Sequence, residues 1–309
     1  MKFFIYTDLP KKLQSRLKSA LGDYGELIFR TELSDNAINE FQAATILFGN
    51  APKNWFTPLP DNLKFWQLDS AGFDQYADVK VNAVVANMGD FFSIMCAETM
   101  VAGILAYYRH IHDLVRFQSE KRWVGKPLRY KLELLSRKKV IILGAGTIAL
   151  CIEKLLTGFE CEVKMTARTN AKAQIRSTEE LMQALPAADL IINTLPGKAN
   201  QYVNETFFNS MVEGSVYASI GRGNTTDEKA LLRALESRRL AGAILDVTEQ
   251  EPLPDSSQLW AMNNVILTQH TGGGHKMEDE GKADLFIENA RRFLDGEKIK
   301  NQVDLAAGY

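Results

Sequence analysis

The feature that most constrains the fold is a glycine-rich turn between a strand pattern and a helix pattern. The apolar run Val140–Leu143 predicts a buried strand, and Ile148–Leu156 predicts a helix. Between them lies the turn Gly144-Ala145-Gly146-Thr147-Ile148-Ala149. In such a turn the first glycine permits a tight bend, the second lets the backbone approach a pyrophosphate, and a small third residue lets the helix pack on the strand. The helix N-terminus then offers N–H groups to phosphates, so the turn predicts a dinucleotide-binding domain.

Strand and helix patterns alternate along the chain, which predicts an α/β fold with parallel sheets. A length of 309 residues favours two domains. Capping-box pairs predict two helix starts, at Ser177 with Glu180 and at Thr225 with Glu228. The other expected helices are Leu13–Leu21, a long helix near 93–117 and Met277–Leu294, and the expected strands are 3–6, 44–48, 64–68, 83–85, 140–143, 161–166, 190–194, 216–220, 243–245 and 265–268.

Composition excludes several classes of partner. The net charge is −2, and no basic surplus indicates nucleic acid or an anionic membrane surface. The most apolar stretch, Phe91–Tyr108, contains Glu98 and has helical spacing, which favours a buried amphipathic helix over a membrane span. The three cysteines form no C-x-x-C pair, so we expect a reduced, cytoplasmic protein.

The end of the strand after the turn predicts which cofactor is bound. NAD-preferring sites usually place a carboxylate there to bind the ribose hydroxyls. Here the strand ends in Ala167-Arg168-Thr169-Asn170, and Arg168 lies 24 residues after Gly144 (168 − 144 = 24). A guanidinium and a hydroxyl suit a 2′-phosphate, which a carboxylate would repel. We therefore expect NADP(H), with NAD(H) possible; the alternative is a solvated surface arginine.

Three charged residues late in the chain indicate chemistry as well as binding. Arg222 lies between Gly221 and Gly223, whose small size would let a ligand approach, and its guanidinium suits a 2-oxo carboxylate. His270 follows a strand, and a nearby carboxylate such as Glu251 would favour an imidazolium that donates a proton to a carbonyl. Taken singly, the arginine could be a surface ion pair and the histidine structural.

These motifs resemble the D-isomer-specific 2-hydroxyacid dehydrogenases, particularly the glyoxylate/hydroxypyruvate reductase branch. The resemblance covers nearly the whole chain. It rests, in order, on Lys64–Asp74, Ala97-Glu98, the glycine-rich turn, Gly221-Arg222-Gly223, Leu245-Asp246-Val247, Glu251-Pro252-Leu253-Pro254, His270 and the closing Gly308-Tyr309. The chain departs from the family pattern in three places: Gln269 replaces a proline, Gly197–Gln201 lacks two threonines, and Ser219 replaces an asparagine.

The resemblance implies a role for each candidate residue. Arg222, Glu251 and His270 match the catalytic residues, and Asp246 matches the aspartate near the nicotinamide amide. It also implies two Rossmann-like or flavodoxin-like domains. Residues 1–97 and 283–309 would form the substrate domain, with a coenzyme domain of 98–282 inserted. The expected cofactor residues are Gly144, Gly146, Thr147, Ile148, Arg168, Thr169, Leu195, Pro196, Ile220, Asp246 and Gly273, and the expected substrate residues are Asn50, Ser70, Ala71, Gly72 and Arg222.

We therefore expect a homodimeric, NADPH-dependent enzyme that reduces a small 2-oxo acid to the D-2-hydroxy acid. An alternative is a dinucleotide-sensing binding protein, which resembles the corepressors built on this scaffold. The presence of Arg222, Glu251 and His270 disfavours it. A formate dehydrogenase shares the fold, but that branch has glutamine where this chain has Glu251.

Overall fold

The computed structural model describes residues 1–33 and 36–307, so the Gly308-Tyr309 motif lies outside the described residues. Contacts divide the chain into two compact units. Unit 1 contains Met1–Phe92 and His275–Tyr309, and unit 2 contains Ser93–Gly274. Boundaries at 97/98 and 282/283 would instead cut through helices α3 (Ser93–Tyr108) and α10 (Glu278–Leu294). Each helix packs as one rod, so each stays whole within one unit.

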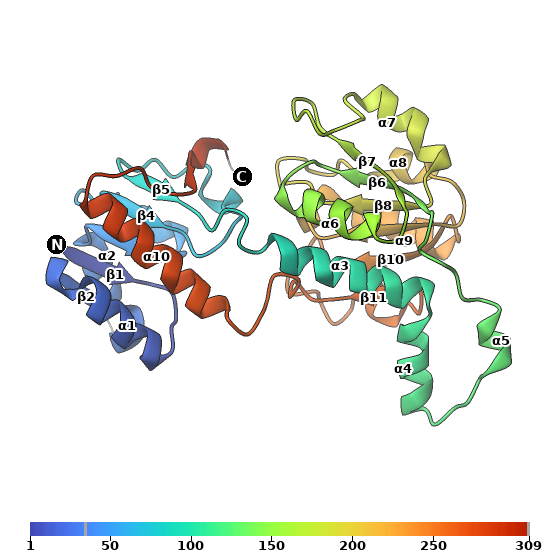
Figure 1. The fold of residues 1–309 in the computed structure, drawn as a ribbon, viewed down its shortest axis with the longest axis horizontal. Coiled ribbons are helices and arrows are strands. Elements are labelled where there is room, and N and C mark those ends of the chain that lie inside the picture. Colours follow the sequence, from blue (N-terminus) through green and yellow to red (C-terminus); the bar gives the residue numbers. More distant parts are fainter. Residues whose placement is uncertain (34–35, 308–309) are drawn as a thin grey trace. The chain divides into compact units, whose positions relative to one another are not determined.

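Unit 1 is a six-stranded sheet in the order β12-β5-β4-β3-β1-β2. All neighbouring strands are parallel except β12, which is antiparallel to β5. Figure 1 shows α10 and α1 together on one face of this sheet. The elements are β1 (Lys2–Ile5), α1 (Lys11–Leu21), β2 (Glu26–Phe29), α2 (Ala37–Gln42), β3 (Ile46–Phe48), β4 (Phe65–Gln67), β5 (Val84–Ala86), α10 and β12 (Gln302–Val303).

The unit 1 sheet is buried on both faces, because consecutive apolar residues alternate between two cores. Phe3 and Ile5 pack with the apolar faces of α1 and α10, while Phe4 joins a second core around Trp66. Continuous apolar runs are typical of such doubly covered parallel strands. The same packing explains Phe48, which is stacked on Phe286 with ring centroids 4.3 Å apart.

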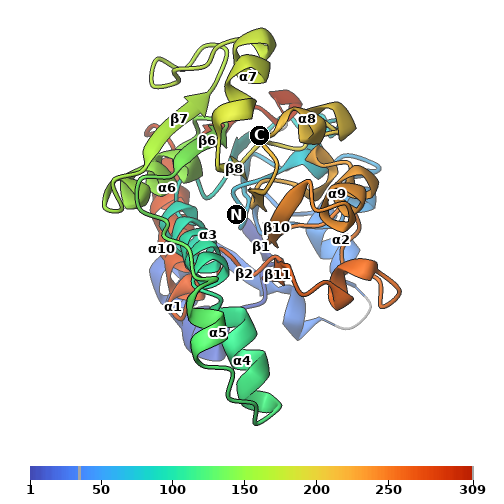
Figure 2. The same cartoon turned by 90° about the vertical axis from the view of Figure 1, so that its right-hand side faces the viewer.

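Unit 2 is a second six-stranded sheet, parallel throughout, in the order β11-β10-β9-β8-β6-β7. Helices α3 and α6 lie side by side on one face, and α8 and α9 pack on the other (Figure 2). Two doubly wound sheets confirm the predicted fold class. The elements are α3, α4 (Ile111–Ser119), α5 (Lys126–Arg129), β6 (Lys139–Leu143), α6 (Thr147–Thr157), β7 (Glu162–Thr166), α7 (Thr178–Ala184), β8 (Leu190–Asn193), α8 (Glu205–Ser210), β9 (Ser215–Ser219), α9 (Glu228–Glu236), β10 (Leu240–Leu245) and β11 (Val265–Leu267).

The prediction of a single helix near 93–117 is wrong, because the helix is interrupted between α3 and α4. His110 has φ 52° and ψ 31°, a left-handed conformation that no α-helix continues through. Helix α4 therefore leaves the sheet, and with α5 it projects from the rest of unit 2 (Figure 1). No helix within residues 1–33 and 36–307 combines the length and apolar character needed to cross a membrane.

Candidate active site

The glycine-rich turn follows β6 and opens α6, as its sequence predicts. Gly144 has φ +106°, and a Cβ there would lie 2.7 Å from Thr194 Oγ1, so the position requires glycine. Its N–H donates to Thr166 Oγ1 at 3.0 Å. A Cβ at Gly146 would meet no described atom within 4 Å, which leaves the N-terminus of α6 open to a ligand. Ala149 is fully buried, whereas Thr147 is exposed and Ile148 half-buried.

The loop after β7 carries Arg168 and Thr169, whose side chains are both exposed. Asn170 ties this loop to the glycine-rich turn, because its Nδ2 donates to the Ala145 carbonyl at 2.8 Å. The Asn170 Oδ1 also accepts from the Lys172 N–H at 3.0 Å. The loop is thus held beside the turn while the two proposed 2′-phosphate ligands face solvent. Sequence reasoning did not assign Asn170 this role.

A buried polar network holds the loops after β8 and β9. The Asn193 amide donates to Tyr217 Oη at 2.9 Å and to Thr225 Oγ1 at 2.8 Å, and its Oδ1 accepts from the Leu195 N–H at 3.0 Å. Thr225 Oγ1 in turn donates to the Arg222 carbonyl at 2.6 Å. The network therefore orders both the Leu195-Pro196 loop and the backbone of Arg222. It joins strands β8 and β9 to the loops that follow them, so no local sequence pattern reveals it.

Thr225 is consequently not a helix cap, and the predicted capping box with Glu228 is wrong. The α9 N-cap is Asp227, whose side chain accepts from the Ala230 N–H at 3.0 Å. The other predicted cap is confirmed, since Ser177 Oγ accepts from the Glu180 N–H at 3.1 Å.

Arg222 is half-buried after β9 and the buried Ile220, and its Nη1 donates to the Gly221 carbonyl at 2.9 Å. The flanking glycines lie in close contact with neighbouring loops. A Cβ at Gly221 would lie 2.4 Å from the Leu195 carbonyl oxygen, and one at Gly223 would lie 1.7 Å from the Thr248 carbonyl oxygen. Both glycines therefore let neighbouring loops pack directly against the arginine's backbone.

Asp246 follows β10 and organises the segment around His270. Its Oδ1 accepts from Thr268 Oγ1 at 2.5 Å and from the Gly272 N–H at 3.1 Å, and its carbonyl accepts from the His270 N–H at 2.6 Å. A Cβ at Gly272 would lie 2.8 Å from Asp246 Oδ2, so this position leaves little room for a side chain. The next residue, Gly273, is half-buried in the same turn. Burial, with a smaller contribution from the Asp246 charge, raises the pKa of the Cys96 thiol on α3 to about 11.

His270 and Glu251 form a hydrogen-bonded pair. His270 Nδ1 lies 2.6 Å from Glu251 Oε2, and Glu251 Oε1 accepts from the Thr248 N–H at 3.0 Å. The Thr248 N–H therefore orients the Glu251 carboxylate, whose other oxygen contacts Nδ1 of the imidazole. This arrangement leaves Nε2 as the ring nitrogen that could face a substrate. His270 and Gln269 both have left-handed backbones, with φ 53° and φ 54°.

A cavity of about 420 Å³ adjoins this pair, and its walls include Leu253, Trp260 and Leu267. Its volume lies within the range of small-molecule sites, and apolar walls with a few polar groups are usual in such sites. Within unit 2 the structure thus brings together a hydrogen-bonded histidine–carboxylate pair, the ordered carboxylate of Asp246 and a cavity.

The predicted substrate loop lies in unit 1, after β4. Ser70 Oγ donates to the Gly72 carbonyl at 2.6 Å and accepts from Asn50 Nδ2 at 2.9 Å, while Asn87 Nδ2 donates to the Ala71 carbonyl at 2.6 Å. Asn50 follows β3, and parallel strands place such carboxyl-end loops at one edge of the sheet. The structure therefore brings Asn50 and Ser70–Gly72 together as one ordered loop cluster.

Comparison with known proteins places this architecture in a family. Residues 101–272 match the model described as D-isomer specific 2-hydroxyacid dehydrogenase, NAD binding domain. An uncharacterized protein in the proB 3′ region of Corynebacterium melassecola is 32% identical over 285 residues, covering 88% of this chain and 92% of that protein. Glyoxylate/hydroxypyruvate reductase A of Salmonella typhimurium is 29% identical over 219 residues, covering 69% of this chain and 68% of the reductase.

A solved structure supports the same family assignment over the full length of the chain. The D-isomer specific 2-hydroxyacid dehydrogenase from Xanthobacter autotrophicus Py2, in complex with NADPH and MES, has a TM-score of 0.82 and 26% identity. The match covers 100% of this chain and 99% of that one. The matched family model and the solved structure agree with the fold described above. The chain belongs to the D-isomer specific 2-hydroxyacid dehydrogenase family.

Proposed function

We propose that this dehydrogenase uses NADPH to reduce a small 2-oxo acid, of the glyoxylate or hydroxypyruvate class, to its D-2-hydroxy acid. The observation that carries the proposal is the 2.6 Å contact between His270 and Glu251. A histidine held by a carboxylate at Nδ1 can protonate a carbonyl oxygen through Nε2. The names of the Salmonella reductase and of the NADPH-bound Xanthobacter enzyme support the substrate class and cofactor.

Each residue then has a distinct part in the reduction. Bound NADPH supplies the hydride. Arg222 binds the substrate carboxylate and polarises the carbonyl, since its planar fork can meet two oxygens. His270 donates the proton to the oxygen on which negative charge develops, and Glu251 stabilises the imidazolium and fixes its orientation. The Ser70–Gly72 loop contributes backbone groups to the carboxylate.

Arg168 and Thr169 are the residues we propose for the 2′-phosphate, and the cofactor would lie along the α6 N-terminus with Leu195, Pro196, Ile220, Asp246 and Gly273 around it. The exposure of both side chains at the end of β7 supports this assignment. A guanidinium there favours NADPH over NADH because the extra phosphate gains a charge-assisted contact.

The test is NADPH consumption with a panel of 2-oxo acids, followed by chiral analysis of the product. Turnover of glyoxylate or hydroxypyruvate, with a D product from the latter, is expected. Tight NADPH binding without turnover of any panel member would contradict the proposal and favour the dinucleotide-sensing alternative.

We also propose that the protein is a cytoplasmic homodimer. Large apolar side chains are exposed along the segment that contains α4 and α5, and monomeric proteins rarely leave such contiguous patches uncovered. A second copy of the chain would cover them. The exposed residues are Ile111, Leu114, Val115, Trp123, Tyr130 and Leu134.

A further inference from the structure

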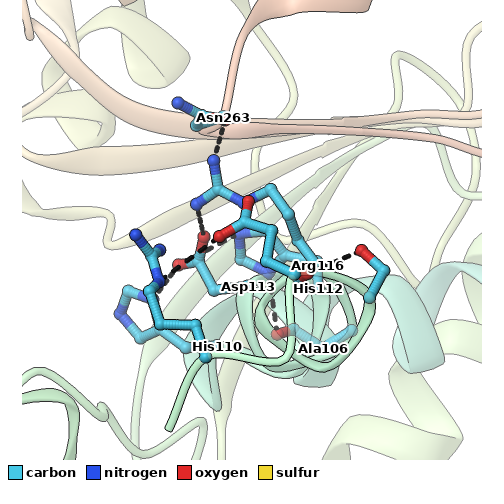
Figure 3. Close-up of polar contacts among 9 residues, drawn as sticks. Ala106, His110, His112, Asp113, Arg116 and Asn263 are labelled. Carbon is cyan, nitrogen blue, oxygen red and sulfur yellow. Dashed lines mark hydrogen bonds and ion pairs between the residues drawn. The ribbon is translucent and has the colours of Figure 1, made fainter. Parts of the chain in front are cut away.

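The break between α3 and α4 gathers three potential metal ligands that the proposed reaction does not use. His110 precedes α4, and His112 and Asp113 lie in its first turn. One nitrogen from each histidine and one carboxylate oxygen lie within 4.8 Å of one another. Figure 3 shows the three side chains converging beside Arg116.

The hydrogen bonds around His112 indicate which of its nitrogens can bind a cation. His112 Nδ1 lies 3.2 Å from the Ala106 carbonyl, which can only accept, so the neutral ring carries its proton on Nδ1. The Nε2 lone pair then faces Asp113 Oδ2 at 3.8 Å, too far for a hydrogen bond. Two electron-pair donors therefore face each other across a gap. A histidine bonded to a carbonyl through its other nitrogen is the usual arrangement of a metal ligand.

Asp113 is the shared carboxylate of the cluster. Its Oδ2 lies 2.8 Å from His110 Nδ1, and its Oδ1 accepts from Arg116 Nη2 at 2.6 Å. Arg116 also donates to Asn263, and this second bond fixes the guanidinium that orients the Asp113 carboxylate. Bonds of about 2.0–2.1 Å to a tetrahedral ion place ligand atoms about 3.3–3.4 Å apart. The observed 2.8 Å and 3.8 Å separations bracket that value, and all three ligand atoms lie within 4.8 Å of one another.

The ligand set and its surroundings select the kind of ion. The three side chains are 28%, 19% and 16% exposed for His110, His112 and Asp113. They line a cavity of about 520 Å³, and Lys131 and Arg238 also line it. A single carboxylate disfavours Ca²⁺ or Mg²⁺, which need several oxygen ligands. Two imidazoles and one carboxylate suit Zn²⁺, with water as the fourth ligand.

We propose that His110, His112 and Asp113 bind Zn²⁺ at the junction of α3 and α4. The ion links the first turn of α4, through the His112–Ala106 contact, to the last turns of α3. It stabilises the direction in which α4 leaves unit 2. The site is independent of the proposed reduction, and its test does not use enzyme activity.

The experiment is calorimetric titration of the metal-stripped full-length protein with Zn²⁺, together with thermal unfolding with and without Zn²⁺. We expect one tightly bound ion per chain and a rise in Tm, since a ligand that binds only the folded state stabilises it. His110→Gln and His112→Gln should each weaken binding at least about tenfold, because even indirect partners of metal ligands contribute about 10–100-fold. His275→Gln is the matched control and should bind Zn²⁺ like the wild type.

Asp113→Asn provides a third variant of nearly unchanged shape in case a histidine variant fails to fold. Co²⁺ substitution reports the donor atoms, and visible bands without a thiolate charge-transfer band are expected. Three results would overturn the proposal: unchanged Zn²⁺ affinity in the folded variants, loss of binding in His270→Gln instead, or a thiolate band from Cys96, Cys151 or Cys161.

Discussion

At the residue scale, His270 is the group whose removal should affect chemistry most selectively. A correctly placed acid contributes about 100- to 10,000-fold. His270→Ala should therefore lower kcat by that range while NADPH affinity stays nearly unchanged, because the histidine binds the substrate side of the reaction. Steady-state kinetics and a fluorescence titration of NADPH measure the two quantities. Near wild-type kcat with a good substrate would eliminate His270 as the proton donor.

Gln269 tests whether the backbone orients that histidine. Its φ of 54° is incompatible with proline, whose ring locks φ near −65°. In Gln269→Pro the backbone of this turn must therefore adopt another conformation. The left-handed conformation of a non-glycine residue itself carries strain of about 1–3 kcal/mol. We expect kcat to fall severalfold or more, whereas Gln269→Gly, which tolerates positive φ, should remain active. Equal kcat for the proline variant and the wild type would show that the His270 position does not depend on this conformation.

Arg168 determines the cofactor in our proposal. Arg168→Ala removes a charge-assisted contact worth about 1.5–3 kcal/mol, so kcat/KM for NADPH should fall by about 10- to 150-fold. The value for NADH should change little, because NADH has no 2′-phosphate. The ratio of the two kcat/KM values is the measurement. A wild-type enzyme that prefers NADH would make the assignment wrong.

At the element scale, Thr225 and Asp227 lie two residues apart but should contribute to stability in different ways. Asp227→Ala removes only an N-cap hydrogen bond of α9, which costs about 1 kcal/mol. Thr225→Val keeps the volume but leaves the fully buried Asn193 short of an acceptor, which costs about 1–3 kcal/mol. Chemical denaturation measures both free energies of unfolding. Because Thr225 also holds the Arg222 carbonyl, Thr225→Val alone should reduce kcat/KM, and Thr225→Ser should restore it.

The elements themselves followed closely from the sequence where the pattern was local. The expected helix Leu13–Leu21 is α1 (Lys11–Leu21), which ends at Gly22, and the expected strand 140–143 is β6. The two strands that sequence reasoning omitted, β2 and β12, are an edge strand and a two-residue strand. Their pairing partners lie elsewhere in the chain, so short windows contain too little periodicity to predict them.

At the scale of the whole molecule, the exposed apolar segment from Ile111 to Leu134 predicts self-association. Trp123 is 96% exposed and Val115 is 62% exposed. Val115→Glu with Trp123→Ser should shift a dimer toward monomer, because a buried charge without a partner is costly at an interface. Sedimentation velocity over a range of concentrations measures this shift. A wild-type protein that sediments as a monomer at every concentration would contradict the proposed dimer.

The sequence by itself determined the doubly wound α/β class, the dinucleotide turn and the pairing of Glu251 with His270. The strands and the turn are encoded in short windows, where apolar spacing and glycine act locally, and the pair was recognised from motif order. Only the tertiary structure decided the roles of Asn170, Asn193 and Thr225, because each bonds to a residue distant in sequence. The left-handed break at His110 also depended on tertiary structure, since the local apolar period continues past it and predicts an unbroken helix.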